Sequence, residues 1–269
     1  MSDEPTASEF AVIARLRERL PAIGDDAAVL PDGLLASMDT LVSGIDWRDD
    51  LSSPADVGWK AIMVNASDIA AMGGRSKWFL VSLAVADGFS VDAFYDGALE
   101  ACAVLGAEVV GGDLSSAPTT TVTVTALGHA DSPVLRSGAS VGDGVYVSGA
   151  LGAAARDLRE GGGAAHRRPT AYMGTLPVGV TAMIDVSDGL VADCAHIADE
   201  SGVRVALLDV PIADGATLAD ALHGGDDYVL VACSPSVVAG WTPIGTCVEG
   251  AGVTVDNAVV APEGWEHSL

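Results

Sequence analysis

Apolar runs of strand length and of helix length alternate along this chain, with glycine, proline or aspartate between them. Residues 34–38, 78–85 and 119–127 are apolar or rich in threonine and valine, and they predict strands. Residues 55–72 and 91–105 carry small and apolar side chains at helical spacing, and they predict helices. A chain that alternates in this way forms sheets covered by helices, so the sequence predicts a mixed α/β (α+β) protein.

A cluster of proline and glycine at residues 129–142 indicates a joint between two halves of the chain. The second half repeats the alternation, with strands expected at 144–148, 183–186, 203–208, 228–233, 242–249 and 253–260, and helices at 150–160, 190–201 and 213–222. Three glycines at 161–163 end one helix and open a flexible stretch to about residue 177. We therefore expect two domains, residues 1–130 and 131–269, each a mixed sheet covered by helices.

The charge balance limits the partners of this protein. The chain has 37 acidic and 13 basic residues, a net charge of -24, and such a surface repels nucleic acid and anionic membranes. The acidic residues are spread along the chain and lysine is almost absent, which resembles proteins of salt-accumulating archaea. In those organisms, salt screens the repulsion between the acidic side chains of a protein.

Two further observations predict a cytoplasmic protein. No apolar run reaches membrane-spanning length, and the first 21 residues lack a basic segment followed by an apolar stretch. The four cysteines are far apart in sequence, so we expect buried thiols in a reducing compartment rather than zinc ligands or disulfides.

The common phosphate-binding motifs are missing from this sequence. Neither lysine follows a glycine, as a P-loop requires, because Lys60 follows Trp59 and Lys77 follows Ser76. The nearest approach to the dinucleotide-binding pattern Gly-x-Gly-x-x-Gly begins at Gly142 and has Val147 where the third glycine is required. A nucleotide would have to be bound in another way.

Aspartates beside glycine or small residues provide that alternative. Each of them alone fits a turn or a helix cap. Asp68 is different, because it lies within an apolar helical stretch where a charge is costly unless it is paired or bound to metal. If several aspartates converge, a divalent cation removes their repulsion, and hard oxygen ligands favour Mg²⁺, which also bridges nucleotide phosphates. The five segments are 24–26, 37–39, 65–68, 111–113 and 185–189.

Seven short motifs, in order, resemble the thiamine-monophosphate kinase family of the aminoimidazole ribonucleotide synthetase-like superfamily. The resemblance extends from about Phe10 to Trp265 and implies a two-domain aminoimidazole ribonucleotide synthetase-like fold. The Asn-x-Ser-Asp-x-Ala-Ala-Met-Gly and Gly-Gly-acid-Asp-Tyr segments are similar to the thiamine branch. The motifs are residues 23–27, 38–42, 60–61 with 64–73, 111–113, 136–138, 184–190 and 224–228.

The resemblance also implies the roles of single residues. It implies several Mg²⁺ ions, with K⁺ as a further candidate ion, and metal ligands at Asp26, Ser37, Met38, Asp39, Asp68, Asp113, Asp185 and Asp188. It places ATP, the co-substrate, at Gly112, Asp113, Arg136 and Ser187. It places the second substrate at Asp46, Asp226 and Trp265. A homodimer formed by the N-terminal halves is expected on the same ground.

The sequence departs from the family pattern on the substrate side. Asp46-Trp47 stands where members carry His-Phe, Asp226 replaces a glutamate and Val229 replaces an acid. The stretch after Gly161 is shorter than in typical relatives. These departures weaken the inferred substrate contacts more than the inferred ATP and metal contacts.

The implied reaction is transfer of the γ-phosphate of ATP to thiamine monophosphate. The attacking phosphate oxygen is already ionised near neutral pH, so no catalytic general base is expected. One alternative is another ATP-using enzyme of the superfamily; a selenophosphate synthetase is disfavoured because no cysteine precedes Cys102. A second alternative is a non-catalytic protein that binds a nucleotide or a thiamine compound.

Overall fold

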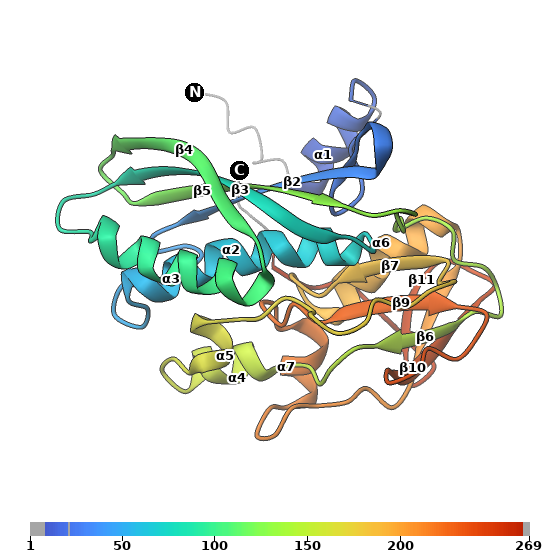
Figure 1. Ribbon diagram of the computed structural model, residues 1–269. Coiled ribbons are helices and arrows are strands. Elements are labelled where there is room, and N and C mark those ends of the chain that lie inside the picture. Colours follow the sequence, from blue (N-terminus) through green and yellow to red (C-terminus); the bar gives the residue numbers. More distant parts are fainter. Residues whose placement is uncertain (1–8, 21, 266–269) are drawn as a thin grey trace, which may run out of the picture.

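The structure, a computed structural model, describes residues 9–20 and 22–265. It contains two sheets, each covered by helices (Figure 1). The expected fold class is therefore confirmed. The exact division at residues 130 and 131 stays a prediction.

The first sheet has five strands and is covered on one face by two helices (Figure 1). Its order is β1 (Ala28–Val29), β2 (Leu34–Val42), β5 (Thr121–His129), β3 (Arg75–Val85) and β4 (Glu108–Ser116). The covering helices are α2 (Pro54–Ala71) and α3 (Val91–Leu105). Strands β3 and β4 run parallel and are connected through α3, whereas the other neighbours are antiparallel. Helix α1 (Glu9–Arg17) and the 3₁₀ turn η1 (Pro31–Gly33) flank the start of this half.

The second sheet has seven strands and belongs to the second half of the chain. Strands β8 and β11 run parallel, and the other paired strands are antiparallel. Its order is β12 (Ala258–Val260), β11 (Gly252–Val255), β8 (Arg204–Leu207), β10 (Thr242–Val248), β6 (Gly144–Val147), β9 (Leu230–Ser234) and β7 (Ala182–Asp185). The helices of this half are α4 (Ala153–Arg159), α5 (Ala164–Arg167), α6 (Leu190–Ser201) and α7 (Leu218–His223).

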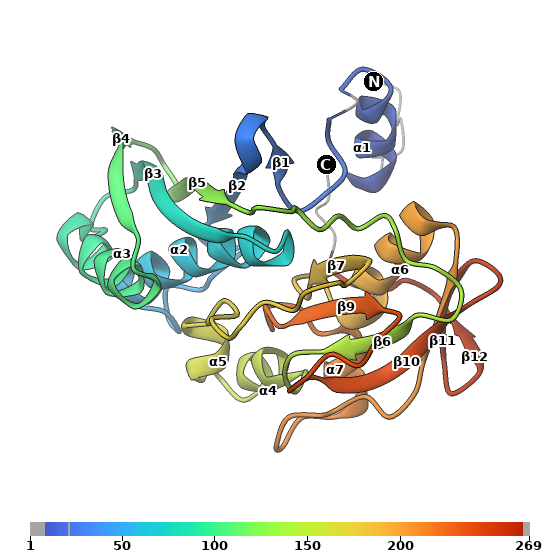
Figure 2. The ribbon, with the colours of Figure 1, turned by 45° about the vertical axis from the view of Figure 1, so that its right-hand side comes forward.

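Helix α2 lies between the two halves (Figure 2). Its start is well defined, because Ser53 and Asp56 form a reciprocal capping box and Pro54 occupies the first turn. Its middle packs in the core of the first sheet, and Ala70 and Ala71 pack in an apolar cluster with side chains of the second sheet. A helix buried on nearly all sides needs small and apolar side chains all round, which explains its composition.

Small residues also set the distance between α2 and α3. A Cβ atom at Gly97 would lie 1.8 Å from the carbonyl oxygen of Ala55, and one at Gly58 would lie 2.0 Å from that of Phe94. The two helices can therefore approach this closely only with glycine at both contacts.

Within the described part of the chain, no helix combines the length and the apolar character needed to cross a bilayer.

Four local expectations need correction. Residues 213–217 are not helical, because Gly215 has a φ of +77° and α7 starts only after the Thr217 cap. Residues 253–260 form two antiparallel strands, since Asp256 and Asn257 adopt left-handed conformations that turn the chain. Strand β4 was not expected, because its glycines and serines have low strand propensity. The stretch after Gly161 contains the short helix α5.

Candidate active site

A cavity of about 750 Å³ lies between the two halves and is lined by residues of both. Its wall includes the N-terminal loop before β1, strand β2, helices α2 and α4, and the loops that follow β7 and precede β9. Sequence-predicted site residues come together here from positions far apart in the chain. They are Asp26, Ser37, Met38, Asp39, Asp46, Asp68, Arg136, Asp185, Ser187, Asp188, Asp226 and Trp265.

Three carboxylates of the cavity wall lie close together. Ligand oxygens of Asp26, Asp68 and Asp185 all lie within 4.8 Å of one another. Burial, followed by repulsion from Asp39, Asp185 and Asp26, holds the pKa of Asp68 well above its usual range. Burial and the charge of Asp26 likewise raise the pKa of Asp185. Converging hard oxygen donors with unfavourable mutual charge fit a divalent cation such as Mg²⁺.

Neighbours on α2 and β2 hold these carboxylates in place. The Ser37 hydroxyl donates to Asp68, and the Ser67 hydroxyl donates to an oxygen of Asp185 at 2.5 Å. The backbone N–H of Asp39 donates to the Asn65 side-chain oxygen at 3.0 Å. Helix α2 therefore positions carboxylates from β2 and β7 as well as its own Asp68.

Arg136 is a cation in direct contact with this cluster. Its guanidinium donates to Asp26 at 2.8 Å, and its backbone N–H donates to Asp25 at 2.7 Å. Burial opposes the charge of Arg136, but Asp26 outweighs burial and raises the pKa of the guanidinium. A partly buried arginine of this kind can contact phosphate oxygens at the edge of the carboxylate cluster.

The loop after β7 carries Ser187 and Asp188 and is fixed from two sides. The buried Asp193 side chain accepts from the backbone N–H groups of Asp188 and Gly189, at 3.2 Å and 3.0 Å. The backbone N–H of Trp265 donates to the Asp188 carbonyl oxygen at 3.1 Å, which brings the end of the described chain to the cavity wall. Burial and the nearby Asp188 raise the pKa of Asp193.

At the other end of the cavity, Asp226 is surrounded by donors. One carboxylate oxygen accepts from Lys60 at 2.7 Å and from His166 at 3.1 Å, and the other accepts from the Tyr228 hydroxyl at 2.9 Å. Burial opposes ionisation of Asp226, but Lys60 and His166 outweigh it and lower its pKa to about 2. Asp46 lies beside this group, and its carboxylate accepts from the backbone N–H of Val42 at 2.7 Å.

Gly112 and Asp113 do not join the carboxylate cluster within one chain. Strand β4, which carries both, is separated from β2 by β5 and β3, a distance of about 14 Å across the sheet. Asp113 pairs with Ser82, whose side chain lies on the sheet face opposite α2 and α3. Gly112 packs so tightly that a Cβ atom would lie 1.8 Å from the Val81 carbonyl oxygen.

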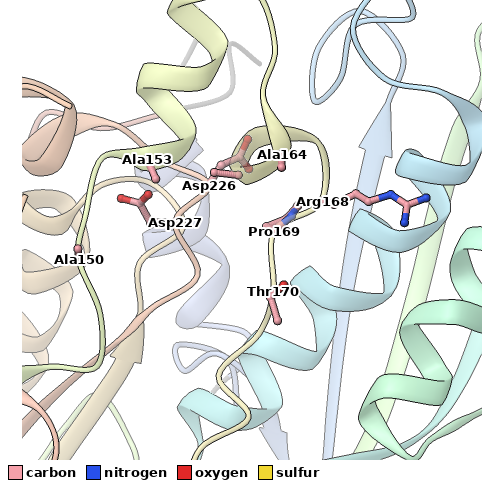
Figure 3. A pocket seen from close by; sticks show the side chains of 9 residues that line it. Ala150, Ala153, Ala164, Arg168, Pro169, Thr170, Asp226 and Asp227 are labelled. Carbon is pink, nitrogen blue, oxygen red and sulfur yellow. The ribbon is translucent and has the colours of Figure 1, made fainter. Parts of the chain in front are cut away.

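A second, smaller pocket of about 310 Å³ lies next to the Asp226 end (Figure 3). Asp226 lines both spaces. The neighbouring Asp227 accepts from the backbone N–H of Gly152 at 2.6 Å, at the start of α4. Burial raises the pKa of Asp227 to about 6, although these backbone donors oppose the shift. In Figure 3, Arg168 points out of this pocket toward α2 and α3.

Sequence reasoning missed several residues of the site. Asn65 and Ser67 lie within one helical turn of Asp68 and belong to the same motif. The sequence therefore offered a signal for them, but only Asp68 was assigned a role from it. Lys60 stood in a recognised motif without an assigned role. His166 carried no signal in the sequence, because the fold brings it to Asp226, 60 residues away. Asp193 lies only five and four residues after Asp188 and Gly189, whose backbone N–H groups it accepts from, but it stands outside the motif that was read.

Comparison with known proteins decides the family. A family model described as AIR synthase related protein, N-terminal domain, matches residues 24–130. The thiamine-monophosphate kinase of Mycobacterium tuberculosis is 42% identical, over 93% of this chain and 88% of its own length. That of Halobacterium salinarum is 35% identical, over 91% and 94%. The chain belongs to the thiamine-monophosphate kinase family.

Solved structures of the family agree with this assignment. A structure described as AaThiL complexed with AMPPCP and TMP is 36% identical, has a TM-score of 0.89 and matches over 97% of both chains. The hydrogenase maturation protein HypE in complex with ATP has a TM-score of 0.69 at 17% identity and shares the fold alone. The expected family and the expected aminoimidazole ribonucleotide synthetase-like fold are therefore confirmed.

Proposed function

We propose that this protein transfers the γ-phosphate of ATP to thiamine monophosphate and produces thiamine diphosphate. Family membership and the AMPPCP and TMP named for the AaThiL structure support this reaction. The observation that carries the proposal is one cavity whose wall holds both a carboxylate cluster and, apart from it, Lys60 paired with Asp226. A cavity of about 750 Å³ has room for two phosphorylated ligands.

In this proposal, Asp26, Asp39, Asp68, Asp185 and Asp188 hold Mg²⁺. The bound Mg²⁺ would neutralise phosphate charge and favour in-line transfer. Arg136 contacts a nucleotide phosphate, since a guanidinium matches phosphate oxygens in geometry and charge. The acceptor phosphate is its own nucleophile, so the site residues position and neutralise rather than remove a proton. The residues that line the cavity give no separate support for K⁺ as a second kind of bound ion.

We further propose that the protein is a cytoplasmic homodimer and that Gly112 and Asp113 serve the cavity of a second copy. What supports this is the outer face of the first sheet at β3 and β4, which no helix of residues 9–20 and 22–265 covers (Figure 1). That face exposes Met38, Trp78 and Leu80, together with the strand that carries Asp113. A second sheet of the same kind would cover these apolar side chains.

The test is turnover against a panel of acceptors. Purified protein with ATP and Mg²⁺ in high potassium chloride should release ADP with thiamine monophosphate and form thiamine diphosphate in equal amount. Thiamine and aminoimidazole-type acceptors should give background rates, and Asp39→Asn should lose turnover while keeping its fold. Binding of thiamine monophosphate without any ADP release would instead support the non-catalytic alternative. ADP release with another acceptor alone would support a different ATP-using enzyme.

A further inference from the structure

His166 is a buried residue beside Asp226, in the part of the cavity wall that we call the acceptor end, and it lies in a very short helix. It belongs to α5, a helix of four residues in the short stretch after Gly161, and it is only 5% exposed. Its Nδ1 atom lies 3.1 Å from a carboxylate oxygen of Asp226. His166 also lines the main cavity, so it is next to both Asp226 and the space for a ligand.

The Asp226 carboxylate receives its donors from three separate parts of the chain. Lys60 comes from α2 in the first half, His166 from α5, and Tyr228 from the loop before β9. Asp226 and Tyr228 both have left-handed backbone conformations, with φ values of 67° and 51°. Such conformations persist where surrounding contacts hold them, so the donors keep this loop in one arrangement.

The segment that carries His166 is itself attached to the first half. The Trp59 indole N–H donates to the Pro169 carbonyl oxygen at 2.6 Å. Arg168 pairs with Asp56 at 2.6 Å and with Glu100 at 2.8 Å, and its guanidinium lies 5.5 Å from the centre of the Trp59 ring. These contacts place α5 against α2, so His166 and Lys60 approach the same carboxylate oxygen from a common support.

We propose that His166 is a positioning residue for the acceptor: its Nδ1–H, with the ammonium of Lys60, fixes the Asp226 carboxylate at the acceptor end of the cavity. This inference rests on the proposed function and deepens it. An ionised carboxylate can only accept hydrogen bonds, so Nδ1 must carry the hydrogen that lies between the two residues. The ring nitrogen that donates to Asp226 is therefore Nδ1. Asparagine and glutamine carry amides on side chains of different length, so substituting each of them for His166 tests the inference.

The experiment compares His166→Asn with His166→Gln. The asparagine amide places a donor near the position of Nδ1, whereas the glutamine amide places it near the position of Nε2. We expect His166→Gln to raise KM for thiamine monophosphate about tenfold, the effect of losing one hydrogen bond to a charged group. KM for ATP should stay within about twofold, and His166→Asn should restore KM for the acceptor to within about threefold of wild type.

Controls separate this role from a general loss of structure. His129→Gln makes the same substitution at a histidine that binds a backbone carbonyl oxygen outside the cavity, and it should leave both KM values unchanged. Melting temperatures and calorimetric binding of thiamine monophosphate are measured for every variant.

Each outcome decides between the two proposals. Equal acceptor KM values in the glutamine and asparagine variants, or a parallel loss for ATP and acceptor, would overturn the positioning role alone. Wild-type protein that neither binds nor phosphorylates thiamine monophosphate would overturn the proposed function and this inference together.

Discussion

Replacing Asp68 by asparagine should stabilise the metal-free protein and remove its response to Mg²⁺. The half-buried Asp68 carboxylate lies within 4.8 Å of Asp26 and Asp185. At that separation and an effective dielectric constant of about 20, each pair of charges costs about 3.5 kcal/mol. Asparagine keeps the shape and can still accept the hydrogen bond from Ser37. The substitution therefore removes repulsion and burial of charge without opening a cavity.

The gain has an upper limit that follows from proton uptake. A carboxyl group with an ordinary pKa of 3.8 can escape the repulsion at pH 7 by binding a proton, at a cost of about 4 kcal/mol. The variant should thus gain between about 1 and 4 kcal/mol in the free energy of unfolding at pH 7. Because the pKa of Asp68 is raised in the folded state, the penalty is complete above that pKa. The gain should therefore shrink as pH falls and vanish below about pH 4.

The measurement is denaturant unfolding at constant high potassium chloride, with EDTA or with excess Mg²⁺, at several pH values. Mg²⁺ should stabilise wild type by about 2–3 kcal/mol at a concentration near 100 times Kd, and the variant by much less. Asp87→Asn makes the same charge change in an exposed turn, and it should change neither the stability in EDTA nor the response to Mg²⁺. A variant that is less stable than wild type in EDTA at pH 7, or that responds equally to Mg²⁺, would refute the carboxylate-cluster argument.

Three further predictions concern the acceptor, the surface charge and the sheet face. Asp46→Asn should raise KM for thiamine monophosphate about threefold or more and leave KM for ATP nearly unchanged, since a carboxylate there attracts the cationic thiazolium ring; unchanged constants in steady-state kinetics would place Asp46 outside the acceptor site. Dilution from about 1 M to 0.01 M salt lengthens the screening distance from about 3 Å to about 30 Å, so a net charge of -24 should lower the melting temperature; an equal melting temperature at both salt concentrations contradicts a halophilic adaptation. Leu80→Glu should halve the mass seen by sedimentation velocity, whereas Leu99→Glu on α3 should not; a Leu80 variant with wild-type mass argues against the proposed dimer face.

Much of the fold was predictable because strong local patterns agree with the final structure. Helices α3 and α6 begin and end at the expected residues, since apolar spacing and a following glycine at 106 or 202 define them. Strand β4 was missed because its pairing with β3 depends on α3 crossing over the sheet, not on local propensity. The turn at Asp256 and Asn257 was missed because its left-handed residues lie inside a continuous apolar pattern.

The site could be predicted where the ligand chemistry is visible in a motif. Aspartates beside glycine, and above all an aspartate inside an apolar helix, indicated a shared cation site, and the fold brings most of them to one cavity. What the sequence could not provide is which side chains act through others. His166 acts on Asp226, 60 residues away in the sequence, and Asp193 acts on backbone N–H groups rather than on a ligand, so a ligand motif indicates neither role.

The placement of Asp113 on the outer face of the first sheet has a consequence for mixtures of inactive proteins. If Asp113 serves the cavity of the partner while Asp68 serves its own, Asp68→Asn and Asp113→Asn fall in the same site of a mixed dimer. One site in that dimer then receives both intact carboxylates. Unfolding and refolding the two inactive variants together in equal amounts should restore roughly one quarter of wild-type activity, whereas each variant refolded alone should restore none. Two genes that each encode a dead enzyme could thus complement each other in one cell.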